Sequence, residues 1–232
     1  MATEEAAKKE VAVIVGAGAG LSAALARRAA ADGMAVALAA RNVEKLADLA
    51  AETGAKAYAC DVTDKAAVER LFAAVQQDLG APDLVVFNPS ARQRGPLVEL
   101  DADAVRRAIE ITAYGGFLVA QAAVRAMLPQ GQGTILFTGA SASVKGYPQS
   151  APFAMGKFAL RGLAQSMARE LAPQGLHIGH VVIDGGIGPA GVGPEAGKLD
   201  PVAIADSYFH LHRQPRSVWT WEIEVRPWTE KF

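Results

Sequence analysis

The stretch that most constrains the fold runs from Val11 to Ala31, VAVIVGAGAGLSAALARRAAA. Its first five residues are apolar and mostly β-branched, which is typical of a strand buried on both faces of a parallel sheet. A glycine-rich turn and an alanine-rich helical pattern follow. Glycine lets backbone amides approach a diphosphate, and a helix N-terminus adds its positive dipole end. A tight strand-to-helix connection would use the same glycines. The residues predicted to hold a dinucleotide here are Gly16, Gly18, Ala19, Gly20 and Leu21.

The rest of the chain repeats this alternation of strand and helix patterns. Further strands are predicted at 34–40, 55–60, 83–87, 134–137, 177–183 and 218–225. Further helices are predicted at 42–53, 64–79, 101–127, 151–171 and 202–212. The pattern predicts an α/β fold, a three-layer Rossmann-like sheet that is parallel and doubly wound. A length of 232 residues fits a single domain, 1–232, with an N-terminal extension at 1–10, a substrate loop and helix at 185–213 and a C-terminal tail at 226–232.

Two adjacent glycines, Gly115 and Gly116, lie inside the predicted helix 101–127. Together they cost about 2 kcal/mol of helix propensity relative to alanine. We therefore expect another element, such as a helix, to pack very close to them.

Composition limits the partners and the compartment. The net charge is -1 with no long run of like charge, so neither nucleic acid nor an anionic membrane surface is indicated. The single cysteine, Cys60, makes no intrachain disulfide, residues 1–10 carry no apolar signal region, and no run approaches the roughly 20 apolar residues of a membrane span. These features predict a cytoplasmic protein. His210 and His212 point to different sides of a helix without a carboxylate or cysteine cluster, so we expect surface or substrate-loop histidines and no metal site.

In a doubly wound sheet the ligand lies beyond the carboxyl ends of the strands, so the residues that follow each strand matter most. Arg41 follows the second strand, where a guanidinium favours a 2'-phosphate and hence NADP over NAD, unless it is simply solvated. Asp61 and Val62 follow the third strand, and the Asp61 carboxylate suits an adenine amino group or a helix start. Asn88 follows the fourth, where a cofactor ribose would lie.

These residues, in this order, resemble the short-chain dehydrogenases/reductases over nearly the whole chain. The family's turn Thr-Gly-x-x-x-Gly-x-Gly is similar to Val15–Ser22, without the Thr and the last Gly. Its Asp-Val matches Asp61-Val62, and its Asn-Asn-Ala-Gly resembles Phe87–Ser90 with only the second Asn present. Lys157–Ile178 is very similar to the family's helix and following strand.

The resemblance implies hydride transfer between a nicotinamide and a carbonyl or carbinol. The family uses a Tyr as acid/base, a Lys four residues later that lowers the phenol pKa and holds the nicotinamide ribose, a Ser, and often an Asn on the preceding helix. Here Phe153 takes the place of the Tyr, while Lys157 is present. Phenylalanine has no proton to give, so the usual mechanism cannot run unmodified.

Other positions are carried over residue by residue. Ser141 is the best match to the serine, with Ser143 and Thr138 as rivals, and Thr112 takes the place of the helix Asn. The family's Pro-Gly after the sixth strand is replaced by Asp184-Gly185. The residues predicted to contact the nicotinamide half of the cofactor are Lys157, Asp184, Gly185 and Ile187.

Three functions remain open. The chain is an NADP- or NAD-dependent oxidoreductase in which Tyr147, Ser141, Asp184 or a water held by Lys157 handles the proton. Alternatively, it is an inactive nucleotide-binding sensor or assembly protein, or it carries out dehydration or isomerisation with Asp184 or a histidine.

The C-terminal third suggests a substrate and an oligomer. The loop 185–197 and the following helix, with Tyr208, Phe209 and Leu211, indicate a small hydrophobic carbonyl or alcohol as substrate. An edge strand next to exposed tryptophans is a liability in a monomer, which favours a homodimer or homotetramer. The tryptophans concerned are Trp219, Trp221 and Trp228.

Overall fold

In the computed structural model, which describes residues 9–231, seven strands form one parallel sheet in the order β3-β2-β1-β4-β5-β6-β7. The strands are β1 (Val11–Val15), β2 (Ala35–Ala40), β3 (Lys56–Ala59), β4 (Leu84–Phe87), β5 (Gly133–Thr138), β6 (Leu176–Ile183) and β7 (Glu222–Val225). The helices are α1 (Leu21–Ala31), α2 (Ala47–Thr53), α3 (Lys65–Asp78), α4 (Ala102–Ile109), α5 (Gly115–Met127), α6 (Ala151–Leu171) and α7 (Pro201–His212).

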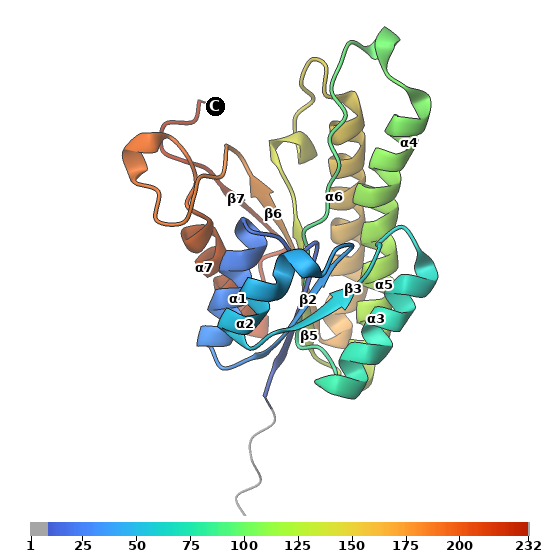
Figure 1. The fold of residues 1–232 in the computed structure, drawn as a ribbon, viewed down its shortest axis with the longest axis vertical. Helices are drawn as coiled ribbons and strands as arrows, with labels where there is room; N and C mark the ends of the chain where they lie inside the picture. Colours follow the sequence, from blue (N-terminus) through green and yellow to red (C-terminus); the bar gives the residue numbers. More distant parts are fainter. Residues whose placement is uncertain (1–8, 232) are drawn as a thin grey trace, which may run out of the picture.

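Helices cover both faces of this sheet. Figure 1 shows α1, α2 and α7 on one side and α3, α5 and α6 on the other, with α4 extending beyond the sheet. The strand order reverses between β1 and β4, as in a doubly wound fold. The predicted three-layer Rossmann-like fold is confirmed.

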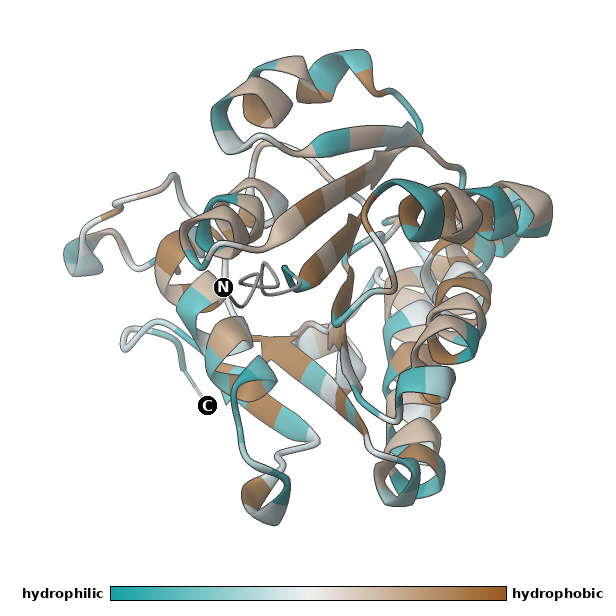
Figure 2. Ribbon diagram, turned by 90° about the horizontal axis from the view of Figure 1, so that it is seen from below, coloured by the Kyte–Doolittle hydropathy of each residue, from teal (hydrophilic) through white to brown (hydrophobic). Residues whose placement is uncertain are grey.

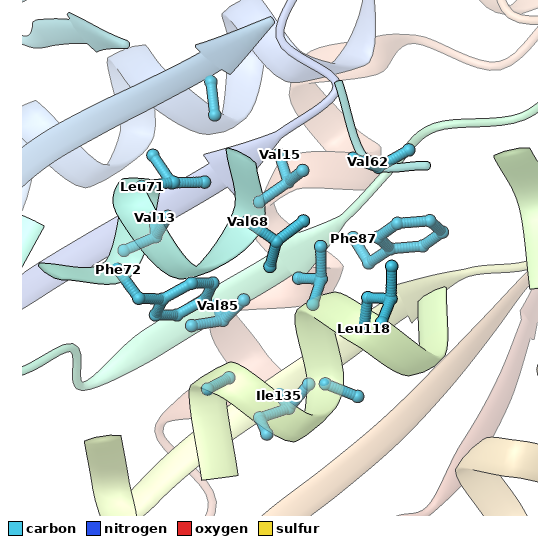
Figure 3. Close-up of a cluster of buried hydrophobic side chains, with 14 of the residues drawn as sticks. Val13, Val15, Val62, Val68, Leu71, Phe72, Val85, Phe87, Leu118 and Ile135 are labelled. Atoms are coloured by element: carbon cyan, nitrogen blue, oxygen red, sulfur yellow. The ribbon is translucent and has the colours of Figure 1, made fainter. Parts of the chain in front are cut away.

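Burial on both faces explains the continuous apolar runs of the strands. Val13, Val85 and Ile135 face α3 and α5 in one core cluster, and Figure 3 shows their side chains meeting Val68, Leu71 and Phe72 of α3. Alternate strand residues enter the second core cluster, beneath α1 and α7. In the hydropathy view of Figure 2 the central strands are mostly brown and the outer helices alternate in colour, as amphipathic helices do.

The predicted helix 101–127 is interrupted. A π-helical segment, Glu110–Tyr114, separates α4 from α5. The expected close packing at the glycines is confirmed: a Cβ on Gly116 would lie 2.5 Å from Leu160 of α6, and one on Gly115 would lie 2.8 Å from Val62. Such π segments occur often at functional sites.

Taken together, α4, the π-helical segment, α5 and the 3₁₀ turn after it, Ala102–Gln130, are long and apolar enough to cross a membrane by length and composition, with a mean hydropathy of 1.3 over the most apolar window. The sequence did not predict this stretch as a possible span, because Gln121 and Arg125 interrupt its apolar run. Of that window, 44% is buried inside the protein, so part of its apolar character belongs to the core.

Two predicted boundaries were wrong. The helix predicted at 42–53 begins as a 3₁₀ turn, Glu44–Leu46, before α2, and the Asn42 carboxamide accepts a hydrogen bond from the Glu44 amide at 3.0 Å. The last strand is shorter than the predicted 218–225, because residues Arg216–Val218 form another 3₁₀ turn.

The helix α7 contributes to the core and not to a substrate pocket. Its Tyr208, Phe209 and Leu211 are at most 2% exposed and pack in the cluster that includes α1. The inference of a hydrophobic substrate from these three residues was therefore wrong. His212 also differs from expectation: its side chain is buried, and Nδ1 lies 2.9 Å from Thr134 Oγ1 at the start of β5.

The C-terminal tail is folded back onto the loop after β6. Arg226 Nη2 donates to Asp184 at 2.9 Å, Pro227 packs against Gly185, and Trp228 Nε1 donates to the Pro194 carbonyl at 3.3 Å. The tail therefore belongs to the wall of the region at the carboxyl ends of β5 and β6.

Candidate active site

Three glycines shape the turn after β1: one is required by its backbone conformation and close packing, and two have open space in front of them. Gly16 has φ +80°, and a Cβ there would lie 2.7 Å from the Pro89 nitrogen, so this position requires glycine. A Cβ on Gly18 or Gly20 would meet nothing within 4 Å, which leaves room in front of the turn. Gly20 precedes α1, whose first N–H groups have no intrahelical partner. The turn therefore presents amides and a helix dipole to an open space that suits a diphosphate.

A second contact ties this turn to the end of β4. Ser22 Oγ donates to the Gly16 carbonyl at 3.0 Å, and Asn88 Nδ2 donates to Ser22 Oγ at 2.7 Å. Asn88 thus fixes the glycine turn and also lines the space in front of it.

A cavity of about 580 Å³ opens from this turn along the ends of β2, β3 and β4. It brings together seven of the predicted cofactor residues, whereas Gly20 and Leu21 form the start of the helix beside it. Those seven are Gly16, Gly18, Ala19, Arg41, Asp61, Val62 and Asn88. Sequence reasoning missed Lys45, which lines the same end of the cavity as Arg41.

The Asp61 carboxylate is held in place within this cavity. Its Oδ1 accepts hydrogen bonds from the Thr63 amide at 3.0 Å and the Thr63 hydroxyl at 2.8 Å. These bonds, with a smaller effect of the nearby Arg41 charge, lower the pKa of Asp61. Asp64 and not Asp61 caps α3, because it accepts from the Ala66 amide at 2.8 Å. Asp61 therefore remains available to a ligand as an ionised acceptor.

A second cavity, of about 760 Å³, shares Asn88 and Ser90 with the first. It lies at the carboxyl ends of β5 and β6. The predicted residues on its wall are Ser141, Tyr147, Phe153, Lys157, Asp184, Gly185 and Ile187. Sequence reasoning missed Arg92, Arg94 and Glu230, which also line it.

Lys157 reaches this cavity from within α6. Its side chain is buried, and Nζ donates to the Thr138 carbonyl at 2.6 Å. Burial, with a smaller contribution from the positive charge of Arg92, lowers the pKa of Lys157 to about 7. A lysine in this state exchanges a proton near neutral pH.

The Phe153 ring occupies the wall one helical turn before Lys157. It packs with Ala140 and Ala142 in a small apolar cluster. The Arg92 guanidinium lies over the ring, 4.4 Å from its centroid, and Lys157 Nζ lies 5.9 Å from it. The position of the missing phenol is thus enclosed by methyl groups and two cationic side chains.

A glycine turn, a dinucleotide-sized cavity and a lysine-bearing cavity joined to it make up the candidate site. A family model described as short chain dehydrogenase matches residues 10–190. The chain belongs to this family. The resemblance inferred from its motifs is confirmed.

Named relatives and solved structures agree with this membership. An uncharacterized oxidoreductase of Staphylococcus aureus strain N315 is 30% identical over 94% of this chain and 97% of its own. A short-chain dehydrogenase of Rhodopseudomonas palustris is 35% identical, with a TM-score of 0.84 over 94% of this chain and 99% of its own. An alcohol dehydrogenase of Thermococcus sibiricus, complexed with 5-hydroxy-NADP, is 27% identical, with a TM-score of 0.85 over 96% and 98% of the two chains.

Of the two serines considered for the family's serine position, Ser141 lines the cavity and Ser143 does not. Ser143 is completely buried: its Oγ accepts from the Ala140 amide at 3.1 Å and lies 3.3 Å from His180 Nε2. Thr138 is engaged as well, since its hydroxyl accepts from Tyr208 at 2.8 Å. Ser141 is therefore the hydroxyl of the three that faces a ligand.

His180 belongs to a buried structural network. Its Nδ1 lies 3.0 Å from Glu222 Oε2, and Arg161 binds the same carboxylate with contacts of 2.6 and 2.7 Å. Burial lowers the pKa of His180 to about 4, so the ring is neutral near pH 7. Because Glu222 only accepts, Nδ1 carries the proton and Nε2 accepts from Ser143. The network holds the loop after β5 and takes no part in the cavity.

Thr112, at the place of the family's helix Asn, does not line the cavity. It lies in the π-helical segment, is buried, and its Oγ1 accepts a hydrogen bond from the Ala91 amide at 3.1 Å. Its role is to hold the segment after β4. Asp184 lies in the wall but is paired with Arg226 at 2.9 Å and Lys145 at 3.4 Å.

Proposed function

We propose that this short-chain dehydrogenase is an NAD(P)(H)-dependent oxidoreductase that interconverts a small carbonyl compound and its alcohol, and that Lys157 transfers the proton to and from the substrate oxygen. One observation carries the proposal. The cavity of the glycine turn and the cavity of Lys157 are contiguous through Asn88 and Ser90, so a dinucleotide in the first extends toward the second.

The residues of the first cavity fit a dinucleotide. The open turn at Gly18 accepts the diphosphate, the ionised Asp61 accepts hydrogen bonds from an adenine amino group, and Asn88 lies at the ribose position. A bound nicotinamide supplies and accepts the hydride. The chain itself has to orient the substrate and supply the proton.

Lys157 is the side chain best suited to the proton transfer. In the direction of reduction the substrate oxygen needs one proton, which Lys157 Nζ gives up directly or through one water and regains from solvent through the open side of the cavity. A pKa of about 7 places Lys157 in both protonation states near neutral pH. Ser141 is positioned to donate a hydrogen bond to the substrate oxygen, whereas Tyr147 is 44% exposed at the rim.

A preference for NADP is part of the proposal. Arg41 and Lys45 both line the adenosine end of the first cavity, and two cations suit a 2'-phosphate better than a bare hydroxyl. Arg41→Ala should weaken NADPH binding by about 10-fold or more while leaving NADH binding unchanged. Equal affinities of the unmodified chain for NADPH and NADH would contradict the proposed preference for NADP.

A catalytically inactive sensor is the second candidate. It is favoured by the apolar cluster of Phe153, Ala140 and Ala142, which leaves no hydrogen-bonding side chain at the position of the family's phenol. Dehydration or isomerisation has less support, because Asp184 is engaged in two ion pairs and His180 is buried in its network.

A cofactor titration followed by a carbonyl panel decides between the candidates. Binding of NADPH with loss of its absorbance on addition of a carbonyl compound is the expected result, and Lys157→Met should abolish turnover. Lys65→Met, an exposed residue of α3, is the matched control and should keep full activity. Binding without turnover on any carbonyl compound selects the sensor.

A further inference from the structure

Two arginines that the reaction above does not use face the second cavity. Arg92 and Arg94 lie on the segment between β4 and α4, and both line the cavity beside Phe153 and Lys157. Within the described residues 9–231, neither side chain makes an ion pair or a hydrogen bond. Both side chains are exposed to solvent where they line the cavity, so their guanidinium groups are available to pair with an anionic ligand.

The segment that carries these arginines is fixed at both ends. The Ala91 amide donates to Thr112 Oγ1 at 3.1 Å, and the Gly95 amide donates to the Gln149 carbonyl at 3.2 Å. Between these points the Arg92 guanidinium stacks on the Phe153 ring, 4.4 Å from the centroid. Stacking uses the face of the guanidinium and leaves its N–H edge free to donate two parallel hydrogen bonds.

The charges around the cavity favour an anion. Its cationic side chains are Arg92, Arg94 and Lys157, and its carboxylates are Asp184 and Glu230. Asp184 is already neutralised by Arg226 at 2.9 Å and by Lys145, which lies behind it, at 3.4 Å. Glu230 alone therefore faces three cations in the cavity.

We propose that the second cavity recognises a substrate with a carboxylate, a short oxo acid or the corresponding hydroxy acid, through the guanidinium edge of Arg92 with Arg94 as a second donor. The proposal rests on the oxidoreductase function above and names its substrate class. In this proposal Phe153 helps to bind the substrate, because stacking on its ring orients the Arg92 guanidinium. Since Arg92 lies over the ring that replaces the phenol, the carboxylate is within a few bonds of the reacting carbonyl.

Binding is tested separately from turnover by using protein saturated with oxidised cofactor, which cannot reduce a carbonyl. Pyruvate, acetoacetate and phenylpyruvate are each compared by calorimetry with their primary amides. We expect at least one acid to bind about 10- to 100-fold more tightly than its amide. If no acid binds more tightly than its amide, the proposal is overturned.

Variants assign the effect to the guanidinium. Arg92→Met should weaken binding of the preferred acid by about 10- to 100-fold without changing binding of the amide. Arg92→Lys should keep the charge attraction to the acid and lose only the paired hydrogen bonds of the guanidinium. Arg94→Met should act in the same direction with a smaller loss. Arg70→Met, an exposed arginine of α3 far from the cavity, is the control. Equal effects of Arg92→Met and Arg70→Met would overturn the assignment.

Turnover then separates this proposal from the oxidoreductase function. Selective acid binding without NADPH oxidation would support the carboxylate site and contradict the oxidoreductase function. Turnover of neutral ketones at the same kcat/KM as oxo acids does the opposite: it supports the oxidoreductase and overturns the substrate class.

Discussion

Phe153 packs with the Ala140 and Ala142 side chains, and the Arg92 guanidinium lies over its ring. Lys157 differs from all of them, because burial brings its pKa to about 7. Compared with the family pattern, the site lacks the phenol, has the Arg92 guanidinium over the Phe153 ring, and keeps Lys157. In the two proposals above, the loss of the phenol bears on the proton donor and the added cation bears on the kind of substrate that fits.

Restoring the phenol is the direct test of this exchange. Phe153→Tyr should raise kcat on a carbonyl substrate by about 100-fold or more, because a phenol above Lys157 supplies general acid catalysis worth about 10²- to 10⁴-fold. Phe158→Tyr, on the exposed side of the same helix, is the control and should change nothing. An unchanged kcat with cofactor binding intact would mean that the site no longer uses an acid at this position.

Lys157 should also leave a signature in the pH dependence of stability. Its pKa is about 7 in the folded chain against an ordinary value of 10.5, so between these values the unfolded chain binds more protons and the free energy of unfolding rises with pH. The slope reaches about 1.4 kcal/mol per pH unit. Lys157→Met should remove this rise, which urea unfolding at several pH values measures. Parallel pH profiles for the two proteins would contradict the lowered pKa.

At the scale of elements, α6 and the interrupted helix α4–α5 define where Phe153 and Lys157 lie. A Cβ on Gly156 of α6 would lie 2.9 Å from Thr112 Cβ in the π-helical segment, and Thr112 in turn holds the Ala91 amide. Gly156 therefore bears on the position of Arg92 through Thr112 and the backbone of Ala91. Close packing of the two helices is what links them.

Two glycine substitutions on α6 test this packing. Gly156→Ala should destabilise the protein by about 1–3 kcal/mol through overpacking and weaken binding of the acid probe. Gly162→Ala meets nothing within 4 Å and should stabilise it by about 0.5–1 kcal/mol through helix propensity. Thermal unfolding of the two variants gives the comparison. Equal stabilities would show that α6 and Thr112 can separate at no cost.

Sequence was sufficient for the elements whose signals are local. The β-branched strand runs, the glycine turn and the Asp64 cap predicted alternating strands and helices in a doubly wound parallel sheet. It was insufficient where tertiary contacts decide: nothing local distinguishes Ser141, which faces the cavity, from Ser143, which is buried against His180. Arg92 lies in a segment without periodicity, and its place depends on Thr112, 20 residues away in another element.

The molecule as a whole retains an apolar surface that suggests a partner copy. Tyr114 and Phe117 stack on one another at the start of α5, and both are more than 40% exposed, as are Met155 and Phe158 of α6. The tryptophans named from the sequence are mostly engaged within the chain, since Trp219 stacks on His177 at 4.9 Å. We therefore expect the homo-oligomer to form on α5 and α6.

Light scattering checks this expectation. The mass in solution should be two or four times 24.2 kDa, and Phe158→Glu should lower it. Val202→Glu, at an exposed position on α7 across the sheet, should leave it unchanged. A monomeric mass for the unmodified chain would contradict the expectation.

The fold-back of the tail bears on how the protein is prepared for any of these experiments. Glu230 lines the second cavity and Trp228 Nε1 donates to the Pro194 carbonyl, so an affinity tag fused to the carboxyl terminus would be attached next to this cavity. Val11 begins the central strand β1, whose amino end lies at the end of the sheet opposite to both cavities (Figure 1). Fusions placed there keep purification handles and labels clear of ligand entry, and carboxyl-terminal fusions make a negative assay uninformative.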